Sequence, residues 1–116
     1  MLYFESLKVY QKAFAVNKEV YKFLKFNKSM PGYLKNQLGR ASMSILLNIA
    51  EGSAKISCKD RRNYLVIASG STFECAALVK FLASEEEIHE GAPARYYQYY
   101  EELSKMLYVM LKNSKQ

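Results

Sequence analysis

Apolar residues recur along the second half of the chain at alternating spacings of three and four residues, which is the period of one face of a helix. Between residues 64 and 83 these positions are Leu65, Ala68, Thr72, Cys75, Val79 and Leu82. Farther along they are Tyr96, Tyr100, Leu103, Leu107, Met110 and Leu111. The sequence contains neither strict alternation of apolar and polar residues nor Asn-Gly turns. The pattern therefore predicts helices and no strands.

Breaks in this pattern divide the chain into four helical segments, at residues 4–27, 33–53, 58–89 and 93–113. The sequence Pro31-Gly32 interrupts the first helix, and Gly52 is expected to end the second in the left-handed conformation. Ser57 with Asp60 is typical of an N-cap followed by an acidic first turn. Short connections place consecutive helices antiparallel. We therefore expect one all-α domain over residues 1–116, an antiparallel up-down-up-down four-helix bundle.

The first predicted helix has an apolar face and a basic face. Its apolar stripe is broad and includes Val9, Tyr10, Ala13, Phe14, Val16, Val20, Tyr21 and Leu24. The opposite face carries Lys8, Lys12, Lys18, Lys22 and Lys25. Most of the net charge of +6 lies in this first quarter of the chain. The lysine face is either simply solvated or attracts a polyanion.

The second and third predicted helices are apolar on two sides. In the second, a stripe that includes Leu38 and Ile45 lies opposite Met43, Leu46, Leu47 and Ala50. In the third, a second face behind the seam consists of Val66, Phe73, Ala77 and Phe81. A chain of 116 residues cannot bury both sides of two helices, and large exposed apolar patches mark interaction sites. We therefore expect a homo-oligomer with closed symmetry.

A narrow polar strip remains on the second predicted helix, and it consists of Gln37, Arg40, Ser44, Asn48 and Glu51. Packing against the third helix places Glu51 level with Arg61 or Arg62, and Arg40 within about a turn of Glu74. Charges removed from water need such partners. We interpret the strip, together with Glu74, as a structural polar network that fixes the register of the two helices. A ligand site is the alternative interpretation.

The composition argues against a membrane or secreted protein. Cys58 and Cys75 are the only two cysteines, and on one helix they lie about 25 Å apart, too far for a disulfide. Free thiols favour a reducing compartment, so we expect a cytoplasmic protein. The longest run without a charge, residues 63–73, is far shorter than the roughly 20 apolar residues that cross a bilayer. We therefore expect no membrane segment.

Signals for catalysis and for metal binding are weak. His89 is the single histidine and lies beside a run of glutamates, whereas a metal site needs several ligands at regular spacing. The sequence has no phosphate-binding glycine loop and no nucleophile elbow, the motifs that typically carry phosphate or acyl chemistry. We therefore expect no metal, no cofactor and no enzymatic activity.

Three segments carry a resemblance to a known family, namely FESLKVYQKA at 4–13, QLGRASMSILLNIAEGS at 37–53 and YLVIASGSTFE at 64–74. Together they resemble the 23S rRNA-intervening-sequence protein family of bacterial four-helix bundles. The resemblance implies an antiparallel bundle that assembles as a homopentamer, and no established activity for most members. A similar fold serves as the accessory protein of diversity-generating retroelements. By position, the family's characteristic polar residues match Arg40, Asn48, Glu51 and Glu74, with no catalytic role implied. Leu46 stands where members often have proline, which implies a straighter second helix.

Two functional hypotheses follow. In the first, the oligomer binds structured RNA or DNA without reading its sequence, through Lys8, Lys12, Lys18, Lys22, Lys25, Arg61 and Arg62. In the second, it is a protein-interaction scaffold or an accessory subunit of a partner enzyme and makes no contact with nucleic acid. The sequence YYQYY at 96–100 is either a stacking platform for bases or part of the core, and its helical phase favours the core.

Overall fold

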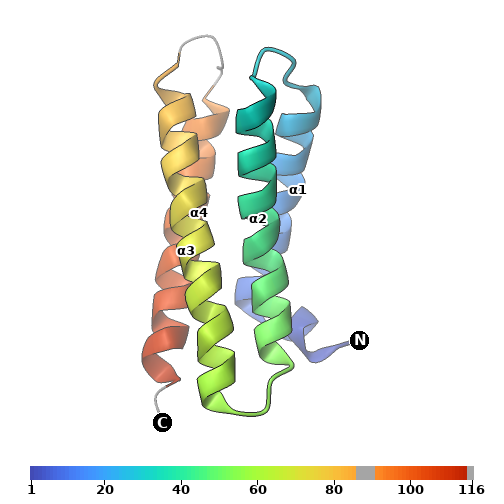
Figure 1. Ribbon diagram of the computed structural model, residues 1–116, viewed down its shortest axis with the longest axis vertical. Coiled ribbons are helices and arrows are strands. Elements are labelled where there is room, and N and C mark those ends of the chain that lie inside the picture. The colour runs from blue at the N-terminus through green and yellow to red at the C-terminus, as the bar shows by residue number, and fades with distance from the viewer. Residues whose placement is uncertain (86–90, 115–116) are drawn as a thin grey trace.

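The computed structural model describes residues 1–85 and 91–114 of the chain and consists of four antiparallel helices (Figure 1). The helices are α1 (Lys8–Phe26), α2 (Gly32–Ser53), α3 (Cys58–Ala83) and α4 (Ala92–Asn113). They run up, down, up and down, so that the N-terminus and the end of α4 lie at the same end of the bundle as the α2–α3 connection (Figure 1). The prediction of an all-α antiparallel four-helix bundle is confirmed.

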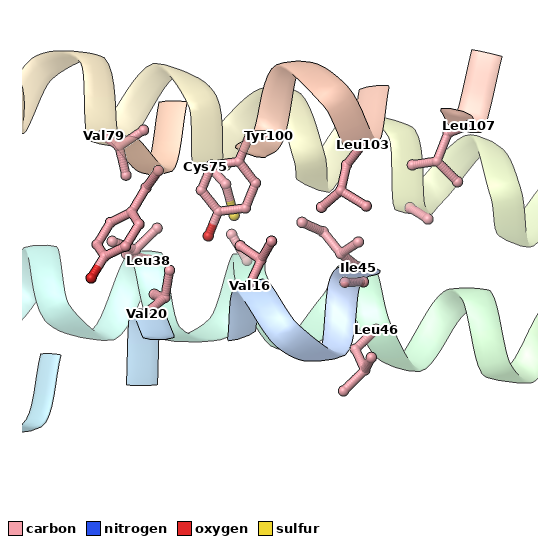
Figure 2. Close-up of a cluster of buried hydrophobic side chains, with 14 of the residues drawn as sticks. Val16, Val20, Leu38, Ile45, Leu46, Cys75, Val79, Tyr100, Leu103 and Leu107 are labelled. Carbon is pink, nitrogen blue, oxygen red and sulfur yellow. The ribbon is translucent and has the colours of Figure 1, made fainter. Parts of the chain in front are cut away.

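One apolar core runs the length of the bundle between the helices. Figure 2 shows Val16 of α1, Leu38 and Ile45 of α2, and Leu103 and Leu107 of α4 pointing into it. From α3 the buried residues are Leu65, Ala68, Thr72, Cys75, Val79 and Leu82, which is the seam that the sequence predicts. The regular spacing of these residues is therefore the cause of the bundle, because it places one continuous apolar stripe of each helix on the shared axis.

Tyr100 and Cys75 are packed side by side at the centre of this core (Figure 2). The Tyr100 hydroxyl has no hydrogen-bond partner of ordinary geometry within the described part of the chain. Burial raises the pKa of the Cys75 thiol to about 12 and also raises the pKa of Tyr100, because the apolar surroundings disfavour the charged forms. Both groups are therefore neutral at physiological pH.

The predicted first helix is in fact two elements. A single 3-10 turn, η1 (Tyr3–Ser6), precedes α1, and Leu7 between them is extended, with φ −75° and ψ 128°. The turn is closed by its own side chains, because the Leu2 N–H donates to the Glu5 carboxylate at 2.8 Å and the Ser6 hydroxyl donates to the Tyr3 carbonyl at 2.7 Å. These local bonds satisfy backbone groups that a longer helix would otherwise use.

The third helix ends earlier than predicted. It stops at Ala83, and the Ser84 hydroxyl donates to the Phe81 carbonyl at 2.6 Å, which satisfies one of the last carbonyl groups of α3. The acidic run that begins at Glu85 is also unfavourable beside the negative end of a helix dipole. The expectations for residues 86–89, His89 included, lie outside the described residues.

Gly52 does not adopt the left-handed conformation that was predicted for it. It remains inside α2. Among the described glycines the positive φ occurs at Gly91, where φ is 78°. A Cβ atom added to Gly52 would lie 2.9 Å from the Cβ of Tyr64 on α3. This position therefore requires glycine because α2 and α3 approach each other closely, not because of a turn.

The second apolar faces of α2 and α3 are largely exposed, as predicted. Met43 and Leu47 on α2, and Val66, Phe73 and Phe81 on α3, lie at the surface of the single chain. Leu46 is the exception, since it is buried. The reason is that α1 covers this side of α2, where the Asn17 amide donates to the Ser42 carbonyl at 2.9 Å.

By length and composition alone, α3 is long and apolar enough to cross a membrane, with a mean hydropathy of 1.5 over its most apolar stretch. No other helix in residues 1–85 and 91–114 passes this test. The buried seam and the exposed face behind it together account for the apolar composition of α3. The bundle is compact, and this one helix gives no clear indication of a membrane protein.

Candidate nucleic-acid interface

The outward side of α1 carries three exposed lysines. Because successive helical residues are rotated by about 100°, Lys18, Lys22 and Lys25 project away from the buried seam of α1, which includes Val16 and Val20. We call these three residues the α1 lysine group. It occupies the half of the helix nearest the α1–α2 connection.

The other two predicted lysines lie apart from this group. The Lys12 ammonium lies 3.3 Å from the Glu102 carboxylate of α4 and 5.0 Å from the centre of the Tyr99 ring. It is therefore partly neutralised and serves to hold α1 against α4. Lys8 is exposed at the first residue of α1, about 15 Å along the axis from Lys18.

No acidic side chain of α1 offsets the α1 lysine group. Glu19 is the single carboxylate between Lys8 and Phe26. It lies on the side of α1 that faces α4, where its carboxylate is 3.7 Å from the Arg95 guanidinium. The outward side of α1 is therefore uniformly positive.

Two aromatic residues that were assigned to the apolar stripe of α1 share its outward side. Phe14 is 45% exposed and Tyr21 is 64% exposed, so the predicted stripe is too wide. The Lys18 ammonium lies 5.9 Å from the centre of the Phe14 ring, and the Lys25 ammonium lies 5.9 Å from the Tyr21 ring. Attraction between an ammonium and an aromatic face stabilises such pairs at the surface.

Arg61 and Arg62, near the start of α3, donate hydrogen bonds to backbone carbonyls at the end of the bundle away from the α1 lysine group. The Arg61 guanidinium donates to the carbonyls of Lys55 at 3.0 Å and Ile56 at 2.6 Å, and it also contacts the Cys58 sulfur at 2.9 Å. It therefore fixes the α2–α3 connection. Arg62 donates to the Leu111 carbonyl at 2.6 Å, at the end of α4. We leave both arginines out of the candidate interface, because their guanidinium groups are held against backbone carbonyls at the end of the bundle away from the α1 lysine group.

The tyrosine cluster at 96–100 packs against the core. Tyr96 and Tyr100 are buried, and Tyr97 and Tyr99 are partly buried. Burial raises the pKa of Tyr96, whose hydroxyl lies 3.4 Å from the Glu19 carbonyl of α1. The cluster therefore joins α4 to α1 and is not an open stacking platform.

The predicted polar strip forms direct contacts between α2 and α3. The Gln37 amide donates to the Glu74 carboxylate at 3.0 Å, and the Ser44 and Ser71 hydroxyls lie 2.8 Å apart. The Asn48 amide donates to the Ser44 carbonyl at 2.8 Å. The Gln37–Glu74 and Ser44–Ser71 contacts join the two helices at one register only, which supports the structural interpretation of the strip, whereas the Asn48 bond lies within α2.

Among residues 1–85 and 91–114, Arg40 and Glu51 form no ion pair. Both side chains are exposed, and the expected pair of Glu51 with Arg61 or Arg62 is not formed. Arg40 lines an open groove of about 560 Å³ between α2 and α3, together with Tyr33, Asn36, Gln37, Ala41, Ser44, Ser71 and Glu74. The groove offers both a guanidinium and a carboxylate to a polar group of another molecule.

The described residues contain no group of three or more His, Cys, Asp or Glu side chains placed to hold a metal ion. Within the same part of the chain both cysteines are free, with Cys75 buried and Cys58 partly buried. The polar and aromatic groups that this part of the chain exposes are the ammonium groups and rings on the outward side of α1, and the groove between α2 and α3.

Comparisons with known proteins identify the family. A family model described as 23S rRNA-intervening sequence protein matches residues 5–109. No curated protein matches the chain. Among solved structures, the chain is similar to a protein of unknown function from the S23 ribosomal protein family of Bacteroides thetaiotaomicron. The TM-score is 0.84 at 24% identity, over 90% of this chain and 98% of that one. This similarity supports the fold, and the family match spans most of the sequence: the chain belongs to the 23S rRNA-intervening sequence protein family.

Proposed function

We propose that this protein is a non-enzymatic binding protein of the cytoplasm that engages nucleic acid through the outward side of α1. The observation that carries the proposal is the α1 lysine group, Lys18, Lys22 and Lys25, exposed on a side that has no carboxylate. Ammonium groups in this arrangement attract phosphates and carry no information about base sequence. Binding is therefore expected to be insensitive to sequence and sensitive to salt.

A single copy offers only weak binding. Each phosphate neutralised on a duplex contributes about −0.9 to the slope of log affinity against log salt, so three lysines give a slope of no more than about −3. Non-specific affinity of useful strength needs more contacts than this. We therefore propose that several copies act together.

The exposed apolar side of α2 and α3 supports assembly of several copies. Met43 and Leu47 lie near Arg40 on the same outward side of α2, and Phe73 and Phe81 extend the apolar surface onto α3. Burial of such residues between subunits contributes about 25 cal/mol for each Å² of apolar surface removed from water, against which the entropic cost of association is set. We propose a closed homopentamer, the assembly that the family resemblance implies, in which the α1 lysine group is repeated around the ring.

The test is a comparison of two variants with equal loss of charge. One replaces the α1 lysine group by glutamine (Lys18→Gln, Lys22→Gln, Lys25→Gln). The control replaces three exposed lysines of α3 and α4 (Lys80→Gln, Lys105→Gln, Lys112→Gln). Fluorescence anisotropy with labelled RNA and DNA is measured at several salt concentrations. The first variant should lose affinity and salt dependence, and the control should retain most of both. Equal losses in the two variants would show that only net charge matters.

The exposed apolar side also favours a second function, that of a scaffold or accessory subunit for a partner protein. Affinity capture from the native host after nuclease treatment separates the two functions. A scaffold should recover a specific protein under these conditions, whereas a nucleic-acid binder should lose its partners.

A further inference from the structure

Aromatic and basic residues alternate in a single row on the outward side of α1. The row consists of Phe14, Lys18, Tyr21 and Lys25, at spacings of four, three and four residues. Residues at these spacings lie on one face of a helix, one above the other. We call this set the α1 row.

The rings of the α1 row are held at the surface. The buried seam of α1 consists of Val9, Ala13, Val16 and Val20, and Tyr10, Phe23 and Leu24 pack partly buried beside it. Phe14 and Tyr21 are too far around the helix to follow this seam, and they remain 45% and 64% exposed. Each ring has a lysine ammonium within 6 Å of its centre, at 5.9 Å in both cases. Each of the two rings therefore combines exposed aromatic surface with a nearby positive charge.

This pairing matches the chemistry of a nucleotide. The face of a base stacks on an aromatic ring, and the phosphate on either side of it is attracted to an ammonium group. Phe26, at the end of α1, is 71% exposed, and its ring centre lies 5.6 Å from the same Lys25 ammonium. The pattern of ring beside ammonium therefore extends to the end of the helix.

We propose that the α1 row binds unpaired nucleotides of single-stranded RNA or DNA. Bases stack on Phe14 and Tyr21, and phosphates lie against Lys18 and Lys25. The two rings are about 10 Å apart along the helix axis, so a short single strand of several nucleotides reaches both. Paired bases cannot bind in this way, because their faces are covered by neighbouring bases in the duplex. This inference rests on the proposed function and specifies its ligand.

The first experiment separates bases from phosphates. Affinity is measured for a labelled single strand of about 20 nucleotides, as DNA and as RNA, and for an abasic DNA backbone of the same length and charge. Tyr21→Ala is expected to weaken binding to the strands with bases about tenfold and to leave abasic binding unchanged. Tyr108→Ala on α4 is the matched control, because Tyr108 is also 64% exposed and lies outside the row.

The second experiment detects stacking directly. The chain has no tryptophan, so Tyr21→Trp introduces a single indole into the α1 row. Its emission should be quenched by the single strand, and neither the abasic backbone nor a duplex of equal length should quench it. Tyr108→Trp, measured in the same way, should show no quenching with any of the three.

The outcomes distinguish this inference from the proposed function. If Tyr21→Ala weakens binding to the abasic and base-containing strands equally, or if the duplex quenches Tyr21→Trp as strongly as the single strand, stacking is refuted. The proposed function then still stands, provided that replacing the α1 lysine group lowers affinity. If no nucleic acid binds at low salt, both fail together.

Discussion

Replacing Gly52 by alanine tests the close approach of α2 and α3. The new Cβ atom would lie 2.9 Å from the Tyr64 Cβ and 3.4 Å from the Arg61 carbonyl oxygen. Neither atom can move without its backbone, so α2 and α3 must separate locally. Gly39→Ala is the control in the same helix, since its Cβ would meet only the Leu24 side chain, at an ordinary contact distance of 3.6 Å.

The two substitutions should change stability in opposite directions. Alanine is favoured over glycine inside a helix by about 0.8–1 kcal/mol, and Gly39→Ala should gain most of this. Gly52→Ala gains less near the helix end, and overpacking opposes the gain by roughly 1–3 kcal/mol. We therefore expect a net loss of about 1 kcal/mol for Gly52→Ala, and a difference of about 2 kcal/mol between the variants.

Urea unfolding followed by circular dichroism measures both variants, at one protein concentration because assembly alters apparent stability. Adding Tyr64→Ala to Gly52→Ala should restore little, since the Cβ atom that clashes is still present. If Gly52→Ala proves as stable as Gly39→Ala, the helices are not in the close contact described above, and the reasoning is wrong.

Three further predictions concern the core, a helix cap and the exposed apolar side. The pKa of Cys75 is raised in the folded chain to about 12, so the unfolded chain loses this proton first as pH rises. Stability is then fully present below about pH 9 and is lost above it. Between about pH 8 and pH 10 the Cys75 thiol should account for a loss of about 1.4 kcal/mol in the free energy of unfolding. In urea unfolding, Cys75→Ala should therefore lose less stability over this pH range than the unmodified protein. An equal loss in the two proteins contradicts the assignment. Ser57→Ala should destabilise the protein by about 1 kcal/mol, because the Ser57 hydroxyl accepts the Asp60 N–H at 3.1 Å; Ser53→Ala, whose hydroxyl donates to a carbonyl within α2, should cost less in the same urea assay. Leu47→Glu should reduce the molecular mass found by sedimentation while leaving the helical circular dichroism unchanged, and an unaltered mass would place the subunit contact elsewhere.

The seam of the bundle could be predicted from the sequence because it depends on local periodicity. The core residues of α3, from Leu65 to Leu82, were all assigned correctly. The break between η1 and α1 at Leu7 was missed, since it depends on hydrogen bonds of the Glu5 and Ser6 side chains that also occur within helices. Gly52 was identified as important but for the wrong reason, because only the packed structure shows its closeness to Tyr64.

The candidate site was predicted less completely, because its chemistry depends on partners distant in sequence. Lys12 was assigned to the lysine face, yet it pairs with Glu102, which lies 90 residues away along the chain. Arg61 was expected to pair with Glu51 or to contact nucleic acid, yet it holds the carbonyls of Lys55 and Ile56. The exposure of Tyr21 could have been anticipated from its position between Lys18 and Lys25 on the same side of the helix. Counting Tyr21 simply as an apolar residue does not take this position into account.

The order of the helices has a consequence for how the chain folds. Each helix packs against the one before it. The connections are short, such as the α1–α2 connection, which contains Pro31, and the α2–α3 connection, which contains Ser57. Closing loops of this length has a low entropic cost. A topology rich in local contacts folds within microseconds to milliseconds. During synthesis the hairpin of α1 and α2 can therefore form before α4 leaves the ribosome, so that α3 and α4 dock onto a surface that is already in place.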